Sequence, residues 1–288
     1  MAYIIMNGIE ERFENMKTLK DAVYGFAVAD ALGVPYEFNN RGTFNCVDMI
    51  GHGTWNQPVG TWSDDTSMLL ATCDSIRECK KIDPEDMRRR FERWAFTGYY
   101  TANGDVFDIG GTTSQALRQK RGMDDLRANG NGSLMRILPL AFIECTDDEI
   151  FNVSAITHAH DISKEACLIY VAIAKRLIQG EDIKSILDSF KLLDDTVFER
   201  ISLIADLPES EIKSTGYVVD SLEAALWCLC NTASYKECVL KAVNLGGDTD
   251  TIAAVAGGLA GMIYGYSSIP EDWIEKLKNK SLIDSCLF

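Results

Sequence analysis

The sequence of 288 residues predicts an all-α fold built as one large domain. Apolar residues recur at helical spacing in most segments, and several of these segments begin with the hydroxyl or acidic residues that cap helices. No series of alternating apolar and polar runs bounded by turns indicates a sheet. No internal repeat or low-complexity linker divides the chain. We therefore assign residues 1–15 to an N-terminal arm and residues 16–288 to a single domain.

The first half of the chain begins with a helix that Thr18 caps, with Asp21 three residues later completing a capping box. Apolar residues follow at helical spacing as far as Gly33, and Pro35 ends the pattern. Residues 41–59 are rich in Gly, Asn and Thr, which predicts a long loop with a short extended piece over residues 44–50. Further helices are expected after residues 60–66, over residues 83–97 and, more weakly, over residues 113–119.

The second half is also predicted to be helical. Ala166, Ile169, Ile173 and Leu177 share one face of a helix that Gly180 ends. Further helices are expected over residues 182–190, 195–205, 220–230 and 235–244, followed by a short one after Pro270. The pairs Asp220 with Glu223 and Ser234 with Glu237 have the spacing of capping boxes for the helices that they begin.

Residues 246–265 are predicted to form the central helix of the molecule. Ala253, Gly257, Gly261 and Gly265 recur every four residues, so they form one smooth ridge against which another backbone can pack closely. A glycine inside a helix costs about 1 kcal/mol relative to alanine, so these glycines indicate a close contact that offsets the cost.

Composition excludes several classes of protein. A net charge of -15 argues against a nucleic-acid groove, which requires clustered Lys and Arg, and it suits cation binding. Nine cysteines without zinc-site spacing indicate thiols in a reducing compartment. The chain has no secretory signal, and the apolar run over residues 252–264 is shorter than the ~20 residues of a membrane span. We expect a cytoplasmic monomer that binds neither nucleic acid nor membrane.

Two predicted helix starts carry the same oxygen-bearing side chains. One contains Ser63, Asp64 and Asp65, and the other contains Asp248, Asp250 and Thr251. If the two converge, their carboxylates must be neutralised by protons or by a cation. Oxygen ligands select a hard cation such as Mg²⁺ or Mn²⁺, and two opposed sets suit a pair of ions about 3.5–4 Å apart. The alternative is that each set only caps its own helix.

Five stretches of the chain form a recognisable set: residues 25–37, residues 61–66, residues 130–136, Thr157-His158 and residues 246–251. Together they resemble the ADP-ribosylglycohydrolase family, whose members include the dinitrogenase reductase-activating glycohydrolase and the ADP-ribosylarginine hydrolases. The resemblance implies an orthogonal helical bundle of that family's type. It also implies two divalent cations, Mg²⁺ or Mn²⁺, and hydrolysis of the glycosidic bond between ADP-ribose and its acceptor. The substrate would be an ADP-ribosylated protein, with arginine the favoured acceptor, or a small ADP-ribose derivative.

The resemblance also assigns roles to individual residues. The metal ligands would be Ser63, Asp64, Asp65, Asp248, Asp250 and Thr251, with serine at residue 63 where many members have threonine. Glu37 and Asp108 are both candidates for the catalytic base, because branches of the family differ in which acid acts. The residues that bind ADP-ribose would be Gly110, Gly111, Asn131, Gly132, Ser133 and His158, since glycine-rich turns at helix starts offer N–H groups to a pyrophosphate.

Two other interpretations fit the same residues. The chain could be a non-catalytic ADP-ribose-binding, immunity or structural protein on this fold, although a purely structural role does not require both acidic sets. A two-metal phosphoesterase is the other alternative, but such sites commonly include histidine, and neither acidic motif contains one. Asp30, late in the first helix, is interpreted as a buried hydrogen-bonding acid rather than a ligand.

Overall fold

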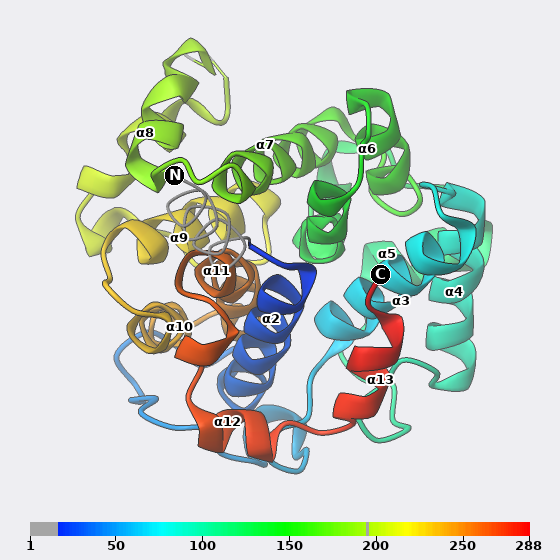
Figure 1. The fold of residues 1–288 in the computed structure, drawn as a ribbon, viewed down its shortest axis with the longest axis horizontal. Coiled ribbons are helices and arrows are strands. Elements are labelled where there is room, and N and C mark those ends of the chain that lie inside the picture. The colour runs from blue at the N-terminus through cyan, green and yellow to red at the C-terminus, as the bar shows by residue number, and fades with distance from the viewer. Residues whose placement is uncertain (1–16, 194–195) are drawn as a thin grey trace, which may run out of the picture.

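The computed structural model describes residues 17–193 and 196–288, which form α-helices and 3₁₀ helices joined by loops (Figure 1). Apart from three isolated β-bridges, these residues contain no β-structure. The prediction of an all-α fold is confirmed. The predicted arm over residues 1–15 lies outside the described residues.

The α-helices that organise the molecule fall into two groups along the chain. The first group comprises α2 (Leu19–Gly33), α3 (Asp64–Cys79), α4 (Pro84–Thr97), α5 (Gly111–Gln119), α6 (Asp147–Ser154) and α7 (Asp161–Ile178). The second comprises α8 (Ile183–Asp188), α9 (Val218–Cys230), α10 (Tyr235–Asn244), α11 (Thr249–Tyr264), α12 (Glu271–Lys276) and α13 (Lys280–Cys286). Among the 3₁₀ helices, η1 (Val34–Tyr36), η4 (Asn131–Arg136) and η5 (Leu138–Phe142) lie near the candidate site described below.

Helices α2 and α11 lie side by side at the centre of the molecule and pack backbone against backbone (Figure 1). A Cβ added at Gly25 would lie 2.4 Å from the carbonyl oxygen of Gly257, and one at Gly261 would lie 2.2 Å from that of Asp21. At the far end of α2, a Cβ at Gly33 would lie 2.4 Å from the Cα of Asp250. The predicted glycine ridge is therefore a real contact, and it fixes the end of α2 against the start of α11.

Other helices surround this pair with large side chains. The Tyr235 hydroxyl of α10 donates a hydrogen bond of 2.6 Å to the Gly25 carbonyl, and the Tyr170 hydroxyl of α7 donates one of 2.8 Å to the Val255 carbonyl. Both hydroxyls are buried, so these bonds satisfy groups that would otherwise be left unpaired. None of the described helices is long and apolar enough to cross a membrane.

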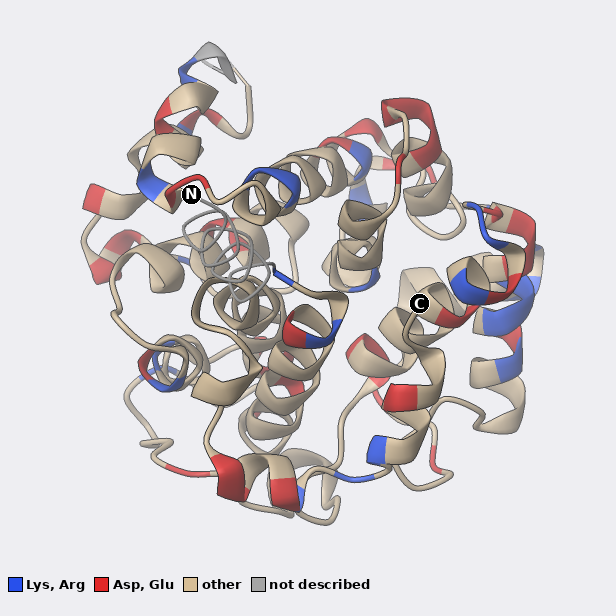
Figure 2. Cartoon of the chain, in the orientation of Figure 1, with Lys and Arg blue, Asp and Glu red and all other residues tan. Residues whose placement is uncertain are grey.

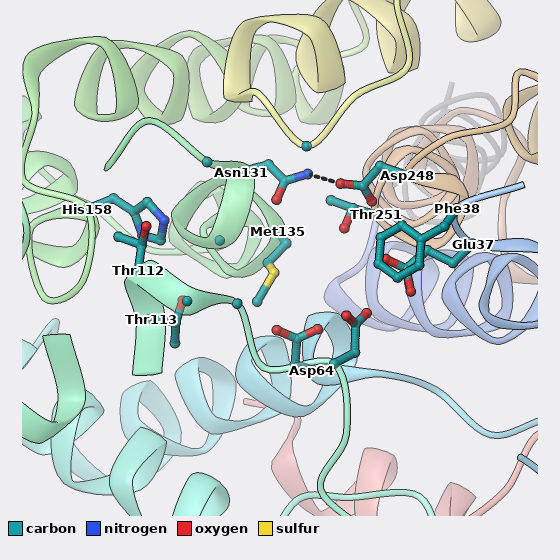
Figure 3. Close-up of a pocket in the computed structure, with 16 residues that line it drawn as sticks. Glu37, Phe38, Asp64, Thr112, Thr113, Asn131, Met135, His158, Asp248 and Thr251 are labelled. Atoms are coloured by element: carbon teal, nitrogen blue, oxygen red, sulfur yellow. Dashed lines mark hydrogen bonds between the residues drawn. The ribbon is translucent and has the colours of Figure 1, made fainter. Parts of the chain in front are cut away.

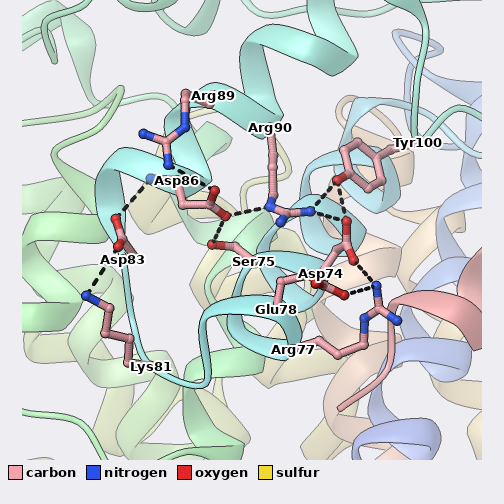
Figure 4. A network of polar contacts seen from close by, with 10 residues as sticks. All are labelled: Asp74, Ser75, Arg77, Glu78, Lys81, Asp83, Asp86, Arg89, Arg90 and Tyr100. Carbon is pink, nitrogen blue, oxygen red and sulfur yellow. Dashed lines mark hydrogen bonds and ion pairs between the residues drawn. The ribbon is translucent and has the colours of Figure 1, made fainter.

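Helices α3 and α4 are joined by a network of ion pairs (Figure 4). Arg90 of α4 contacts Asp74 of α3 and donates from Nε to Asp86 at 2.6 Å, while the Tyr100 hydroxyl donates to Asp74 at 2.6 Å. Desolvation alone would raise the pKa of Asp86, but hydrogen bonds from Arg90, Ser75 and Arg89 outweigh it and lower that pKa to about 2. Asp86 therefore stays charged, and the network holds α4 to the outer face of α3.

One expected capping box was wrong, and some other segments differ in detail from the prediction. Helix α9 begins at Val218, and the Asp220 carboxylate accepts a hydrogen bond from the Thr215 hydroxyl at 2.6 Å, so the expected capping box with Glu223 does not form. The helical segment expected over residues 195–205 is a 3₁₀ helix over residues 199–206, and residues 44–50 are loop, without strand pairing. Helix α6 was not predicted, although Thr146 and Glu149 form a complete capping box at its start.

Candidate active site

The two acidic helix starts meet in space. Asp64 and Asp65 begin α3, Asp250 and Thr251 lie in the first turn of α11, and both starts reach the centre of the fold. The Thr251 hydroxyl donates to Oδ1 of Asp65 at 3.2 Å, and the Ser63 hydroxyl donates to Oδ2 of the same carboxylate at 3.3 Å. Residues almost two hundred positions apart therefore share one site.

Asp250 lies at the junction of two groups of acids. Carboxylate oxygens of Asp30, Asp65 and Asp250 lie within 4.8 Å of one another, and so do those of Glu37, Asp108 and Asp250. Oδ2 of Asp250 is buried and has no hydrogen-bond partner among the described residues. Buried oxygens without donors are costly unless a cation or a proton satisfies them. The set contains only oxygen donors, so its chemistry fits a hard cation such as Mg²⁺ or Mn²⁺.

Asp30 has a structural role that differs from that of the other acids. Its carboxylate accepts hydrogen bonds from the Ser63 N–H at 3.0 Å, from the Thr66 N–H at 3.0 Å and from the Thr66 hydroxyl at 2.6 Å. The two N–H groups belong to the start of α3, where backbone N–H groups have no partner within the helix and need an acceptor from elsewhere. Asp30 therefore caps α3 from α2 and holds its acids in place, in agreement with its interpretation as a hydrogen-bonding acid.

Burial makes the acidic cluster resist ionisation. It raises the pKa of Asp64, Asp65 and Asp250 well above the ordinary value, and repulsion between neighbouring carboxylates raises it further. Burial also raises the pKa of Asp248, although the Asn131 amide opposes this by donating to Oδ2 at 2.9 Å. A divalent cation would offset both the desolvation and the repulsion, so the cluster is expected to bind one more tightly as its acids ionise.

Glu37 and Asp108 approach the cluster from two loops. Glu37 follows η1, and the Trp55 indole donates to its Oε2 at 2.5 Å. Asp108 precedes α5 with φ +58°, a backbone conformation that is strained for a residue other than glycine. Burial raises the pKa of Glu37 to about 7, and burial together with repulsion from Asp64 raises the pKa of Asp108 further. The two candidate bases thus face the same acids.

A cavity of about 260 Å³ opens above the acids. Figure 3 shows Glu37, Asp64 and Asp248 on one side of it, which we call the acidic end. His158 and Thr113 lie on the opposite side, together with the glycine turns, and we call this the neutral end. None of the described residues that line the cavity is Lys or Arg. A ligand can therefore place an anionic part away from the carboxylates while its other part reaches them.

Glycines line the neutral end, and at Gly132 a side chain would not fit. A Cβ at Gly132 would lie 2.8 Å from Cε1 of His158 and 2.9 Å from the Thr113 hydroxyl oxygen. Gly110 and Gly111 form the start of α5 and line the cavity, and a Cβ at Gly111 would meet no atom within 4 Å. The turn at residues 110–111 thus presents the start of α5 to the cavity, where N–H groups without an intrahelical partner favour an anion.

The remaining expected site residues fall into two groups. Asn131 and His158 line the cavity, as do Asp108, Asp248 and Thr251. Ser133 does not, because its buried hydroxyl accepts hydrogen bonds from the Ser154 hydroxyl at 3.0 Å and the Cys167 thiol at 3.4 Å. Its side chain therefore supports the turn from behind instead of facing a ligand.

The cavity also includes residues that the sequence did not indicate. Phe38 follows Glu37 and is 65% exposed at the cavity, and Thr112 and Thr113 follow the glycine pair at the start of α5. Extending each predicted motif by one or two residues would have found these three. Gly216 gave no such signal: it reaches the cavity only because its carbonyl accepts the Asn131 N–H at 3.0 Å, beside Asp248.

Known proteins resemble this chain over most of its length. The chain is 33% identical over 289 residues to the ADP-ribosylarginine hydrolase Tri1 of Serratia proteamaculans, over 94% of this chain and 78% of that protein. It is 30% identical over 279 residues to the ADP-ribosyl-(dinitrogen reductase) glycohydrolase of Rhodospirillum rubrum, over 90% of each. A solved structure described as an ADP-ribosylglycohydrolase-related protein complex superposes with a TM-score of 0.79 at 30% identity, over 92% of this chain and 94% of that one. Because the model of the ADP-ribosylglycohydrolase family also matches residues 14–287, the chain belongs to that family.

Proposed function

We propose that the protein releases ADP-ribose from modified arginine side chains, in a reaction that depends on two divalent cations. Membership of the family makes the chain a hydrolase of glycosidic bonds to ADP-ribose. The observation that carries the metal dependence is the orphaned Oδ2 of Asp250, which belongs to both groups of carboxylates. No donor among the described residues satisfies that buried oxygen, and a cation would do so.

The acids would divide the work of the reaction. Ser63, Asp64, Asp65, Asp248, Asp250 and Thr251 would hold the cations, while Asp30 keeps the start of α3 in position. When bound, the cations would supply positive charge that orients and polarises the hydroxyls of the ribose next to the scissile bond. Carboxylates that remain free would stabilise the positive charge that develops on the ribose as the bond to the acceptor breaks.

Glu37 is the better candidate for the base that takes a proton from the attacking water. Without bound cations, its pKa of about 7 suits proton transfer near neutral pH, and the Trp55 indole fixes its orientation. In the same state the pKa of Asp108 is raised further, so Asp108 is better suited to donating a hydrogen bond than to accepting a proton.

The acidic end of the cavity favours arginine as the residue that carries ADP-ribose. Phe38 exposes an aromatic ring beside Glu37, and Trp55 lies 6.1 Å from that ring between centroids. A guanidinium group is attracted both to carboxylates and to aromatic faces, whereas the glycosidic oxygen of a modified serine is uncharged and has no hydrogen to donate to either. The names of the two relatives above, which refer to ADP-ribosylarginine and to dinitrogen reductase, agree with a protein substrate.

The test compares peptides that carry ADP-ribose on arginine or on serine, with Mg²⁺, with Mn²⁺ and with a chelator. We expect hydrolysis of the arginine peptide only with metal present, and a loss of at least about a hundredfold in kcat/KM for Asp250→Asn. Asp188→Asn is the matched control, because Asp188 is exposed on α8 and should leave the rate unchanged.

Each contrary result has a defined meaning. If folded Asp250→Asn hydrolysed the peptide at the parental rate, or if the chelator had no effect, the metal-dependent mechanism would be wrong. Faster hydrolysis of the serine peptide would overturn the proposed acceptor while leaving the reaction class intact. Tight binding of both peptides without turnover would instead favour the non-catalytic alternative.

A further inference from the structure

Arg136 is a buried cation behind the neutral end of the cavity. It ends η4, it is fully shielded from solvent, and it does not line the cavity. Its guanidinium donates to the Val153 carbonyl at 3.1 Å and to the Thr157 hydroxyl at 2.8 Å, and it lies 4.6 Å from the centre of the Phe91 ring. A charge with this degree of burial requires a fixed set of acceptors. The proposed reaction assigns it no task, so its position calls for a separate explanation.

The Thr157 hydroxyl connects Arg136 to His158. Among the described residues its oxygen has two polar neighbours, a guanidinium nitrogen of Arg136 at 2.8 Å and Nδ1 of His158 at 2.8 Å. A guanidinium can only donate, so the hydroxyl accepts on that side. Thr157 is fully buried, which leaves Nδ1 as the acceptor for the hydroxyl's own proton.

This chain of hydrogen bonds determines where His158 carries its proton. With Nδ1 accepting, a neutral imidazole must hold its hydrogen on Nε2. Protonation of Nδ1 would give the buried Thr157 hydroxyl two donors as neighbours and leave its own proton without an acceptor among the described residues. In agreement, burial and then the charge of Arg136 lower the pKa of His158 to about 3. Nε2 points to the glycine turn at the cavity, where a Cβ at Gly130 would lie 3.6 Å from it.

We propose that Arg136 is a positioning residue which, through Thr157, fixes His158 as the neutral tautomer with its proton on Nε2 and so supplies the cavity with an N–H donor for an oxygen of ADP-ribose. The proposal rests on the proposed function for the identity of the ligand. The cavity lining has carboxylates at one end and no Lys or Arg, so an anionic pyrophosphate depends on neutral donors at the other. The opposite tautomer would turn the lone pair of Nε2 towards the ligand and repel the ligand's oxygen.

The first measurement reads the tautomer without any ligand. His52 and His160 are the other histidines of the chain, and neither lines the cavity. In a His52→Asn/His160→Asn background, nitrogen NMR of labelled histidine therefore reports on His158 alone. Asparagine suits both positions, because His52 has φ +68° and His160 is a helix N-cap. We expect a protonated Nε2 and an unprotonated Nδ1 from pH 8 down to about pH 5.

The second measurement uses a variant that lacks the Thr157 hydroxyl, which connects Arg136 to His158. Thr157→Val keeps the shape of the side chain but removes the hydroxyl, so His158 should lose its single tautomer and show hydrogen on Nδ1. The dissociation constant for free ADP-ribose should rise about tenfold, the value of one well-placed hydrogen bond. Thr157→Ser keeps the hydroxyl and should restore both the spectrum and the affinity, which loss of packing alone would not predict.

The proposal would be overturned by a parental spectrum with hydrogen on Nδ1, or by a folded Thr157→Val that keeps both the tautomer and the affinity. Because the spectrum needs neither substrate nor metal, it stands apart from the proposed function. If the protein failed to hydrolyse any ADP-ribosyl peptide while His158 still carried its proton on Nε2, only the identity of the ligand would be lost. Conversely, Asp250→Asn should abolish hydrolysis without changing the His158 signals.

Discussion

At the scale of single residues, Asp250 illustrates how a site can be built at the expense of stability. Its carboxylate is fully buried, and one of its oxygens has no partner among the described residues. It lies within 4.8 Å of acids from α2, α3 and two loops. No packing requirement explains this arrangement. Replacing the carboxylate should therefore help the fold while harming the site.

We predict that Asp250→Asn raises the free energy of unfolding of the metal-free protein at pH 8 by about 1–3 kcal/mol. The pKa of Asp250 is raised in the folded state, so the carboxyl favours folding fully only below the unfolded pKa, and that contribution is lost as pH rises through the folded pKa. The advantage of the variant should therefore shrink towards pH 4. Urea unfolding at several pH values in a chelator measures this.

Saturating Mg²⁺ should reverse the order, because binding stabilises the parent and not the variant. Asp188→Asn again serves as the control and should follow the parent in both conditions. A variant less stable than the parent in the chelator would mean that Asp250 contributes to the fold in a way that its contacts do not reveal.

The sequence indicated a possible cluster because its chemistry repeats. Asp64 and Asp65 match Asp248 and Asp250 in type and in their place at a helix start, but the resemblance to the family, and not this repeat, implied that the two sets converge. The Arg136–Thr157–His158 relay could not be inferred, because it depends on which side of a buried hydroxyl each partner occupies. Spacing along a chain does not contain that information.

At the scale of elements, the contact between α2 and α11 fixes the geometry of the site. Gly25 of α2 faces Gly257 of α11 with no room for a side chain. We predict that Gly25→Ala lowers the free energy of unfolding by about 3 kcal/mol, since its Cβ would meet a backbone oxygen that no rotamer change can move. Thermal unfolding monitored by circular dichroism measures the loss.

The matched control is Gly111→Ala, where the added Cβ meets no atom within 4 Å and the backbone φ is negative. It should change the free energy of unfolding by no more than about 0.5 kcal/mol. Equal effects of the two alanines would mean that backbone entropy, and not the closeness of the helices, decides the cost.

The starts and ends of helices were harder to predict from the sequence than the helices themselves. The capping box at Thr18 formed as expected, because the Thr18 N–H donates to the Asp21 carboxylate and the Asp21 N–H donates to the Thr18 hydroxyl. The one expected at Asp220 did not, since a long-range bond from the Val218 N–H to the Asn129 carbonyl starts α9 two residues earlier. Short 3₁₀ segments such as η4 and η5 were also missed, because packing rather than periodicity selects them.

At the scale of the whole molecule, the net charge of -15 is spread over the outer helices rather than confined to the site (Figure 2). Basic side chains gather along α4, where Arg88, Arg89 and Arg90 pair with nearby acids. The remaining acids repel one another across the surface, which destabilises the compact state.

We predict that raising NaCl from about 0.05 M to about 0.5 M raises the Tm of the metal-free protein by about 2–4 °C, since the screening length falls from about 14 Å to about 4 Å. Differential scanning calorimetry in a chelator checks this. Mg²⁺ at matched ionic strength should add a further, saturable increase. A Tm that falls with NaCl would mean that ion pairs such as Arg90 with Asp86 outweigh the general repulsion.

Gly33 has a consequence for attempts to engineer this enzyme. It has no functional group and does not line the cavity, yet a Cβ there would lie within 2.6 Å of both the Cα and the backbone nitrogen of Asp250. Libraries that vary the cavity wall to accept new substrates can leave this position untouched. Libraries that randomise α2 to improve stability should also keep glycine at residue 33. A side chain there would shift Asp250 and reduce activity in a protein that is still folded.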